Sequence, residues 1–202
     1  MNSRRSLLLV AILLGVALLA GTLMLASRPA APAGPLVGSN IGGPFSLIDQ
    51  NGKPFTDRDL QGRYALVYFG YTFCPDVCPL DTQKMSAGLA AFEKQQPLLG
   101  AKVVPVFITV DPERDTPAVL KQFTSAFHPR LVGLTGSVAA IDAAKSAYRI
   151  YAKRAGPPGA KDYLMDHMAV IYLMGPDGKP ISFLGHDATV AQVTDELVKY
   201  VR

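Results

Sequence analysis

Cysteine and histidine are scarce in this chain, which has two cysteines and three histidines among 202 residues. Both cysteines, Cys74 and Cys78, fall in one short segment, so a disulfide between them would close a loop too short to restrain distant parts of the chain. A framework of structural disulfides is therefore excluded. Structural zinc is also disfavoured, because such sites normally use four protein ligands and no convincing fourth ligand accompanies the cysteines.

Excess charge is also lacking over most of the chain. The net charge is +4, but the first 34 residues hold three arginines, Arg4, Arg5 and Arg28, and no acidic residue. Removing these three from the 20 basic residues leaves 17 against 16 acidic ones, a net charge of +1. Nucleic-acid-binding domains concentrate positive charge on one face. We therefore expect no nucleic-acid partner, and the chain shows no internal repeat.

A long apolar run lies near the start of the chain. Residues 7–26 contain no charged side chain, and at about 1.5 Å per helical residue they span roughly 30 Å, the thickness of a bilayer core. The alternative is a cleaved signal peptide, with Ala26 or Ala30 before the cut, but the apolar region of a signal peptide is usually about 7–15 residues long. We predict an uncleaved anchor over residues 1–27, with the chain after it exported.

A spacer and a single domain follow the predicted anchor. Residues 28–37 are rich in proline and alanine and are expected to be extended, and residues 38–202 form the domain. Its apolar patterns predict strands alternating with helices, after a hairpin that turns at Asn51-Gly52. The predicted strands cover residues 64–70, 102–110, 131–134, 168–174 and 181–184, and the predicted helices cover residues 79–94, 117–127, 137–148 and 189–202.

This order of elements predicts an α/β fold. We expect a thioredoxin-like mixed sheet flanked by helices, with an N-terminal β-hairpin extension and an N-terminal transmembrane helix. The Gly/Pro-rich stretch 153–161 is predicted to be an irregular loop, of a length that often serves as a lid or binding segment.

The two cysteines lie between a predicted strand and a predicted helix. Proline is favoured at the first helical position, so we expect Pro79 to begin the helix and Cys78 to lie just outside it. Both sulfurs would then lie near the positive end of the helix dipole, which lowers thiol pKa values and favours thiolate. An inert disulfide within the loop is the alternative.

His167 is the histidine most suited to join the cysteines. It directly precedes the predicted strand 168–174, which is expected to run antiparallel to strand 64–70 and so to begin at the edge where the cysteine turn lies. Two thiolates and an imidazole suit copper, and thiolates favour Cu(I). An ordinary hydrogen-bonded histidine at a strand edge is the alternative for His167.

Other candidate ligands have simpler structural explanations. His128 follows a predicted helix and His186 lies in a turn, so both are interpreted as surface residues. Met165 and Met168 flank His167, and their thioethers would suit a soft metal in transit, but at least one is expected to pack in the core. Asp111 ends a predicted strand and is interpreted as structural; a position facing the site is the alternative.

Three motifs together resemble the Sco/SenC family. They are the stretch from Phe69 to Pro79, the stretch from Thr109 to Pro117, and Asp166-His167 before a strand that ends in Gly175-Pro176-Asp177-Gly178. The likeness covers roughly residues 38–202. It implies a thioredoxin-like copper protein that serves assembly of the dinuclear copper centre of cytochrome c oxidase subunit II. By similarity, Cys74, Cys78 and His167 would bind one copper ion, as Cu(I) or Cu(II).

These observations predict a membrane-anchored copper metallochaperone rather than an enzyme. It would be a single-pass protein of the inner membrane whose domain faces the periplasm, or the mitochondrial intermembrane space in a eukaryote. The expected partners are subunit II, a periplasmic copper donor and a thioredoxin-like reductant that keeps the cysteines reduced.

Two other functions are weighed against this prediction. The first is a thiol-disulfide oxidoreductase that uses Cys74 and Cys78; the three intervening residues, where thioredoxins have two, and His167, where thioredoxins carry a proline, argue against it. The second is a peroxide-reducing enzyme, which needs threonine three residues before its cysteine, whereas Thr72 lies two before Cys74.

Overall fold

The computed structural model describes residues 10, 12–21, 33–157, 159 and 162–202. The chain divides into two compact units, residues 1–31 and 32–202. In the first unit the described residues are helical. No helix within the described parts of the chain is long and apolar enough to cross a membrane. Much of the predicted anchor, 1–27, lies outside the described residues, so the anchor remains a prediction.

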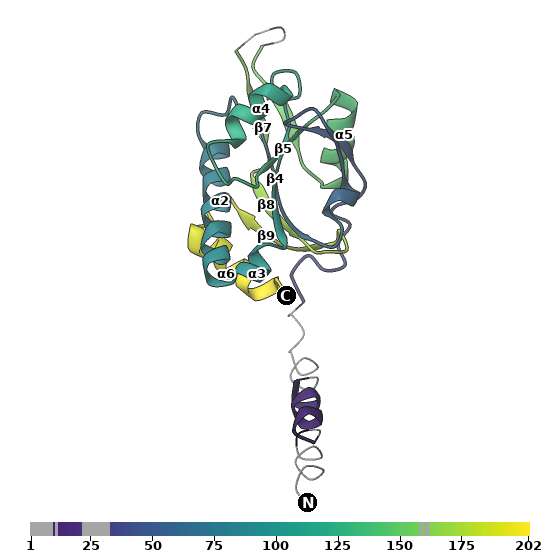
Figure 1. Ribbon diagram of the computed structural model, residues 1–202. Helices are drawn as coiled ribbons and strands as arrows, with labels where there is room; N and C mark the ends of the chain where they lie inside the picture. Colours follow the sequence, from purple (N-terminus) through teal and green to yellow (C-terminus); the bar gives the residue numbers. More distant parts are fainter. Residues whose placement is uncertain (1–9, 11, 22–32, 158, 160–161) are drawn as a thin grey trace, which may run out of the picture. The chain divides into compact units, whose positions relative to one another are not determined.

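The second unit is built on a seven-stranded mixed sheet (Figure 1). Its strands are β1 (Ser46–Asp49), β2 (Pro54–Thr56), β3 (Tyr64–Gly70), β4 (Val103–Thr109), β5 (Val132–Thr135), β8 (Val170–Met174) and β9 (Pro180–Gly185). They are arranged in the order β2-β1-β5-β4-β3-β8-β9. Strands β3, β4 and β5 are parallel, whereas β8 runs antiparallel to β3. The carboxyl end of β3 and the start of β8 therefore share one edge, as predicted.

Helices cover both faces of this sheet (Figure 1). The helical segments are η1 (Asp57–Leu60), α2 (Val77–Gln95), α3 (Pro97–Gly100), α4 (Pro117–Thr124), α5 (Val138–Ala147) and α6 (Val190–Tyr200). Helices α2, α4 and α6 lie on one face and α5 on the other. This layered arrangement is the predicted thioredoxin-like α/β fold.

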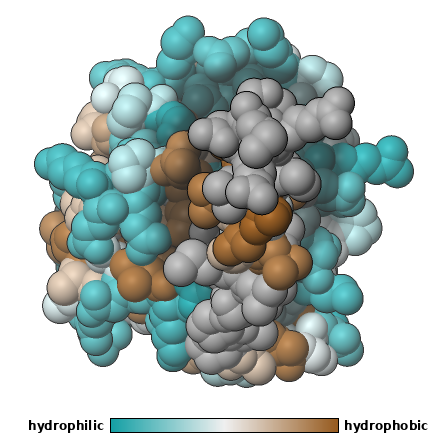
Figure 2. Space-filling model, turned by 60° about the horizontal axis from the view of Figure 1, so that its bottom comes forward, coloured by the Kyte–Doolittle hydropathy of each residue, from teal (hydrophilic) through white to brown (hydrophobic). Residues whose placement is uncertain are grey.

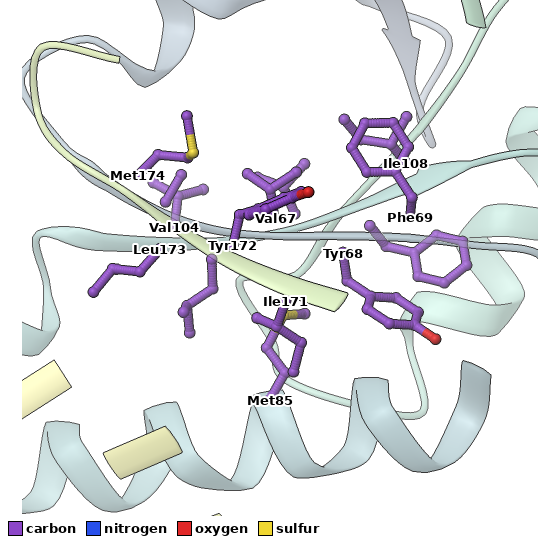
Figure 3. Close-up of a cluster of buried hydrophobic side chains, with 14 of the residues drawn as sticks. Val67, Tyr68, Phe69, Met85, Val104, Ile108, Ile171, Tyr172, Leu173 and Met174 are labelled. Atoms are coloured by element: carbon purple, nitrogen blue, oxygen red, sulfur yellow. The ribbon is translucent and has the colours of Figure 1, made fainter. Parts of the chain in front are cut away.

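The core lies in and around the central strands. Every residue of β3 and β4 is buried, because helices cover both faces of strands whose sequences are almost continuously apolar. Figure 3 shows Tyr68 and Ile171 on the side of Met85 from α2, with Phe69 and Ile108 on the opposite side. The surface seen in Figure 2 is largely hydrophilic, with smaller hydrophobic areas, as expected when the main apolar clusters are internal.

Several predicted elements are confirmed. Strand β3 has the predicted bounds, and β1 and β2 form the hairpin, where Gly52 supplies the positive φ of 77° that the turn requires. Strands β8 and β9 are antiparallel neighbours. At the start of α6, Thr189 and Gln192 form the reciprocal capping box that their spacing suggests.

The predicted loop over residues 153–161 is wrong at its start. Residues Ala152–Ala155 form β6, which pairs antiparallel with β7, Leu164–His167, in a separate two-stranded sheet. The charged and glycine-rich sequence conceals β6, because its exposed pattern provides no buried apolar face to recognise. His167 therefore ends β7 and precedes β8 by a short link, and does not directly open the strand predicted at residue 168.

Candidate metal centre

The cysteines lie where the chain leaves β3 and enters α2. The helix begins at Val77, with Asp76 at the N-cap position, so Cys78 is its second residue and Pro79 its third. The prediction that Pro79 begins the helix with Cys78 outside it is wrong by two residues. Proline is accepted here because the N–H groups of the first helical turn have no partner within the helix, so its missing N–H costs no helical hydrogen bond.

The structure brings Cys74, Cys78 and His167 together. Their ligand atoms all lie within 4.8 Å of one another, and both cysteines are free thiols. The backbone N–H of Cys78 donates to the Cys74 sulfur at 3.4 Å, and the Cys78 sulfur lies 3.2 Å from His167 Nε2. Ligands about 2.0–2.3 Å from a small ion lie up to roughly 4.5 Å apart. The three groups therefore form a potential copper site that needs little rearrangement to close on one ion.

His167 presents the nitrogen that a metal requires. Its Nδ1 lies 3.2 Å from the carbonyl oxygen of Met168, and a carbonyl only accepts, so Nδ1 carries the proton and Nε2 keeps its lone pair. Burial lowers the pKa of His167, which keeps the imidazole neutral. The rings of Tyr68 and Tyr71 meet the imidazole edge-on, with centroids 6.4 Å and 5.8 Å away.

The Cys78 thiol differs from the sequence prediction. Burial raises the pKa of Cys78, whereas the helix terminus was expected to lower it. Cys78 is fully buried, so the cost of placing a thiolate away from water outweighs the partial positive charge of the helix end. The thiol thus keeps its proton until a cation displaces it, and metal binding here must release protons.

Asp115 anchors the cysteine turn to the end of β4. Its carboxylate accepts hydrogen bonds from the backbone N–H and the hydroxyl of Thr72, at 3.0 Å and 2.6 Å, and from the hydroxyl of Thr109 at 2.6 Å. Burial raises the pKa of Asp115. Local sequence does not reveal this role, because Thr72 and Asp115 are 43 residues apart. The two motifs that contain these residues are visible in the sequence, but the contact between them is not.

Asp111 has the structural role predicted for it. It is buried, and it accepts from Arg114 Nε at 2.5 Å and from the Tyr163 hydroxyl at 2.7 Å. Burial, together with the hydrogen bond to Asp111, raises the pKa of Tyr163 to about 12, so this hydroxyl remains a donor at neutral pH. Arg114 also contacts several side chains near the site, and no sequence pattern had singled it out.

Asp81 is a second residue near the site that is not among the candidates from the sequence. It lies three residues after Cys78, is buried, and accepts from the Tyr68 hydroxyl at 3.2 Å. Burial raises the pKa of Asp81, and Lys84 Nζ is 3.5 Å from its other oxygen. The spacing of three in a helix places Asp81 on the same face as Cys78, which is the pattern that would have revealed it.

The remaining histidines lie away from the three ligands. The surface interpretation is wrong for His128, which is buried, with Nε2 3.2 Å from Glu93 and Nδ1 accepting from the Arg130 N–H at 3.2 Å. The folded chain brings Glu93 from α2 over it, a contact that local sequence does not reveal. His186 is exposed, as predicted, and its carbonyl accepts from Lys84 Nζ at 2.7 Å.

The two methionines beside His167 differ in their surroundings. Met165 is partly buried and packs against the hydrophobic core, as expected for at least one of them. Met168 is 43% exposed. Its carbonyl orients the imidazole of His167, as described above.

Comparison with known proteins places these features in a family. The SCO1/SenC family model matches residues 34–202. A curated relative, Protein SCO1 homolog 1, mitochondrial, from Arabidopsis thaliana, is 44% identical over 170 residues, which cover 84% of this chain and 50% of the relative. The chain spans about half the length of the first curated relatives it matches, 50–56%.

Solved structures of relatives have the same fold. ScoI from Bradyrhizobium japonicum with copper bound is 46% identical, with a TM-score of 0.71 over 80% of this chain and 99% of that chain. BsSco, a member of the Sco family of cytochrome c oxidase assembly proteins in which a disulfide switch has been identified, is 26% identical, with a TM-score of 0.62 over 79% of this chain and 93% of that chain. On the family match and the identity to its relatives, this chain belongs to the SCO1/SenC family.

Proposed function

We propose that this protein is a copper metallochaperone that serves the assembly of cytochrome c oxidase. The observation that carries the proposal is the convergence of two thiols and one imidazole within 4.8 Å. Thiolates are soft ligands that favour Cu(I), and imidazole suits copper in either oxidation state. The copper found in the related ScoI structure supports the same cargo here, and the family of BsSco supports the same pathway.

The histidine and the two cysteines would bind copper in different ways. His167 offers the Nε2 lone pair without losing a proton, whereas Cys74 and Cys78 must each release a proton to become thiolate ligands. Three protein ligands leave a small ion open to a further ligand, since closed structural sites normally have four. Transfer then proceeds by exchange, as an acceptor's ligands replace these three.

The finer assignments belong to the same proposal. Residues 1–27 would anchor the protein in the inner membrane and residues 28–37 would link the anchor to the domain 38–202, which faces the periplasm or the intermembrane space. The acceptor would be the dinuclear copper site of subunit II. A copper donor would load the domain, and a thioredoxin-like reductant would keep Cys74 and Cys78 reduced, because a disulfide removes two of the three ligands.

Thiol-disulfide exchange is the second candidate function. The Cys74 sulfur accepts from the Cys78 N–H at 3.4 Å, so the two residues are adjacent and form a disulfide after modest movement. The disulfide switch of BsSco also favours this activity. In this function the dithiol would reduce a cysteine pair of the target, and His167 would be dispensable.

Copper titration of the detergent-solubilised, reduced full-length chain tests the first function against the second. We expect one copper per chain and thiolate-to-copper charge-transfer absorption, both weakened by Cys74→Ala, Cys78→Ala and His167→Ala. Thiol exchange with a model disulfide should survive His167→Ala. If the reduced protein holds no copper while its dithiol still exchanges, the metallochaperone proposal is wrong and the oxidoreductase takes its place.

A further inference from the structure

We infer that Arg114 is a positioning residue of the proposed copper site, which holds the hairpin that carries His167 against the turn that carries the cysteines. The inference rests on the proposed function and extends it, because it names what brings the third ligand to the other two.

The placement of His167 needs an explanation, because its strand lies outside the main sheet. Within the described residues, β7 pairs with β6 in a two-stranded sheet, and neither strand joins the seven-stranded sheet. An isolated two-stranded hairpin is at best marginally stable in water. Side-chain contacts must therefore fix the β6–β7 hairpin against the rest of the domain.

Arg114 contacts the residue immediately before β7. Its Nη1 donates to the carbonyl oxygen of Tyr163 at 3.0 Å, and its guanidinium carbon lies 3.6 Å from the centroid of the Tyr163 ring. Its Nε bonds to Asp111 at the end of β4. The guanidinium therefore connects the start of β7 to the main sheet through both a hydrogen bond and a stacked ring.

The same guanidinium also faces the cysteine turn. Its carbon lies 4.7 Å from the ring centroid of Phe73 and 5.8 Å from that of Tyr71, within the range of cation–π attraction. Phe73 directly precedes Cys74, and the Tyr71 ring meets the His167 imidazole edge-on. Arg114 thus contacts both ligand-bearing segments at once.

Lysine does not have the geometry of this arrangement. A planar guanidinium donates in fixed directions from its edge while its face stacks on aromatic rings, whereas an ammonium is a compact point charge. Arg114 is largely shielded, with a side chain 16% exposed, so these contacts are only weakly screened by water. Lysine keeps the positive charge but not the planar shape. We therefore expect Arg114→Lys to retain part of the copper affinity that Arg114→Gln loses.

The first test measures copper affinity on the reduced, detergent-solubilised full-length chain, by competition with a Cu(I) chelator of known affinity. Loss of a residue that orients a ligand typically weakens metal binding by about 10–100-fold, which is the loss we expect for Arg114→Gln. Arg114→Lys should lose less than Arg114→Gln.

A double-mutant cycle with His167→Ala separates positioning from general damage. If Arg114 acts through His167, adding Arg114→Gln to His167→Ala weakens copper binding by less than about twofold further. Independent, multiplicative losses would overturn the inference. Arg154→Gln is the matched control: Arg154, in β6, also stacks on Tyr163, at 3.6 Å, but its ion pair to the segment after β4 is an exposed one, to Glu113 at 3.8 Å, and exposed pairs contribute little. We expect its copper affinity to stay within about threefold of the unaltered protein.

A readout on the metal-free protein keeps this inference distinct from the proposed function. Amide hydrogen exchange of β7 should accelerate at least tenfold in Arg114→Gln, while exchange in β3 and β4 stays unchanged. If the unaltered protein binds no copper, the proposed function fails, yet the exchange experiment still decides whether Arg114 holds the hairpin. Unchanged exchange in β7 for both Arg114→Gln and Arg114→Lys would show that it does not.

Discussion

The two sides of the proposed copper site are built differently. Cys74 and Cys78 follow β3, a fully buried inner strand of a seven-stranded sheet, and Asp115 ties their turn to β4. His167 ends a two-stranded hairpin outside that sheet. The cysteine side is therefore stabilised by the packed core, whereas the position of His167 depends on a few side-chain contacts.

If the protein delivers copper as proposed, this difference indicates the order in which the ligands would be exchanged. Local openings involve the parts of a protein with the fewest buried contacts, so the β6–β7 hairpin moves at lower cost than β3. In the proposed function, loss of His167 would leave the two cysteine ligands in place, and an acceptor's ligand would enter on the side that His167 leaves. The predictions below test whether the cysteine side is the rigid half of the site.

The largest expected effect is on copper affinity in Cys78→Ala. Cys78 is a fully buried ligand on the rigid side, so its removal should cost more than the roughly 100-fold typical of changes outside the ligand set. His167→Ala should cost less than Cys78→Ala, because the two thiols remain. Competition with a Cu(I) chelator measures the copper affinity of both variants. A larger loss of affinity in His167→Ala than in Cys78→Ala would show that the cysteine side is not the more important half of the site.

The next largest effect is on stability in Asp115→Ala. The change leaves the buried Thr109 hydroxyl and the half-buried hydroxyl and N–H of Thr72 without their acceptor. A buried donor left unpaired costs about 1–3 kcal/mol, and a half-buried one costs less. We expect the free energy of unfolding to fall by about 3 kcal/mol in urea titrations. Thr116→Ala, which removes the N-cap acceptor of α4, should cost only about 1 kcal/mol.

Gly70→Ala tests how tightly the sheet holds Cys78. A methyl group at Gly70 would lie 2.8 Å from a ring carbon of Tyr68, 3.0 Å from one of Phe107 and 3.2 Å from the Cys78 sulfur. Overpacking of this kind costs about 1–3 kcal/mol, and here it should also weaken copper binding by displacing Cys78. Ala65→Gly, also in β3, is the control, because it should lower stability without crowding Cys78. Gly38→Ala does not serve as a control, because the positive φ of Gly38 would itself strain an alanine.

The smallest effect concerns Tyr148, which packs on the opposite face of the sheet from α2. Burial raises the pKa of Tyr148 to about 12, compared with 10 in the unfolded chain. Because the folded pKa is the higher one, the stability contribution is complete below pH 10 and is lost as the pH rises from 10 to 12. Relative to Tyr148→Phe, the unaltered protein should lose about 1.4 kcal/mol by pH 11. A constant difference across this range in urea unfolding would contradict the prediction.

Elements with strong local patterns were predictable. The apolar run of β3, the Asn-Gly turn of the hairpin and the capping box of α6 each depend on residues that are close in sequence, and each was confirmed. The start of α2 was misplaced by two residues, because proline is tolerated at several positions of a first helical turn. The β6 strand was missed because a local hairpin without a buried face lacks a periodic apolar pattern.

The spacing of Cys74 and Cys78 and the β3–turn–α2 unit that presents them follow from contacts between residues close in sequence. The rest of the site depends on packing between distant segments. His167 lies 89 residues from Cys78, and its contact with that thiol depends on the folded sheet and on Arg114. Likewise, the raised pKa of Cys78 follows from complete burial, which is a property of the packed domain and of no single segment.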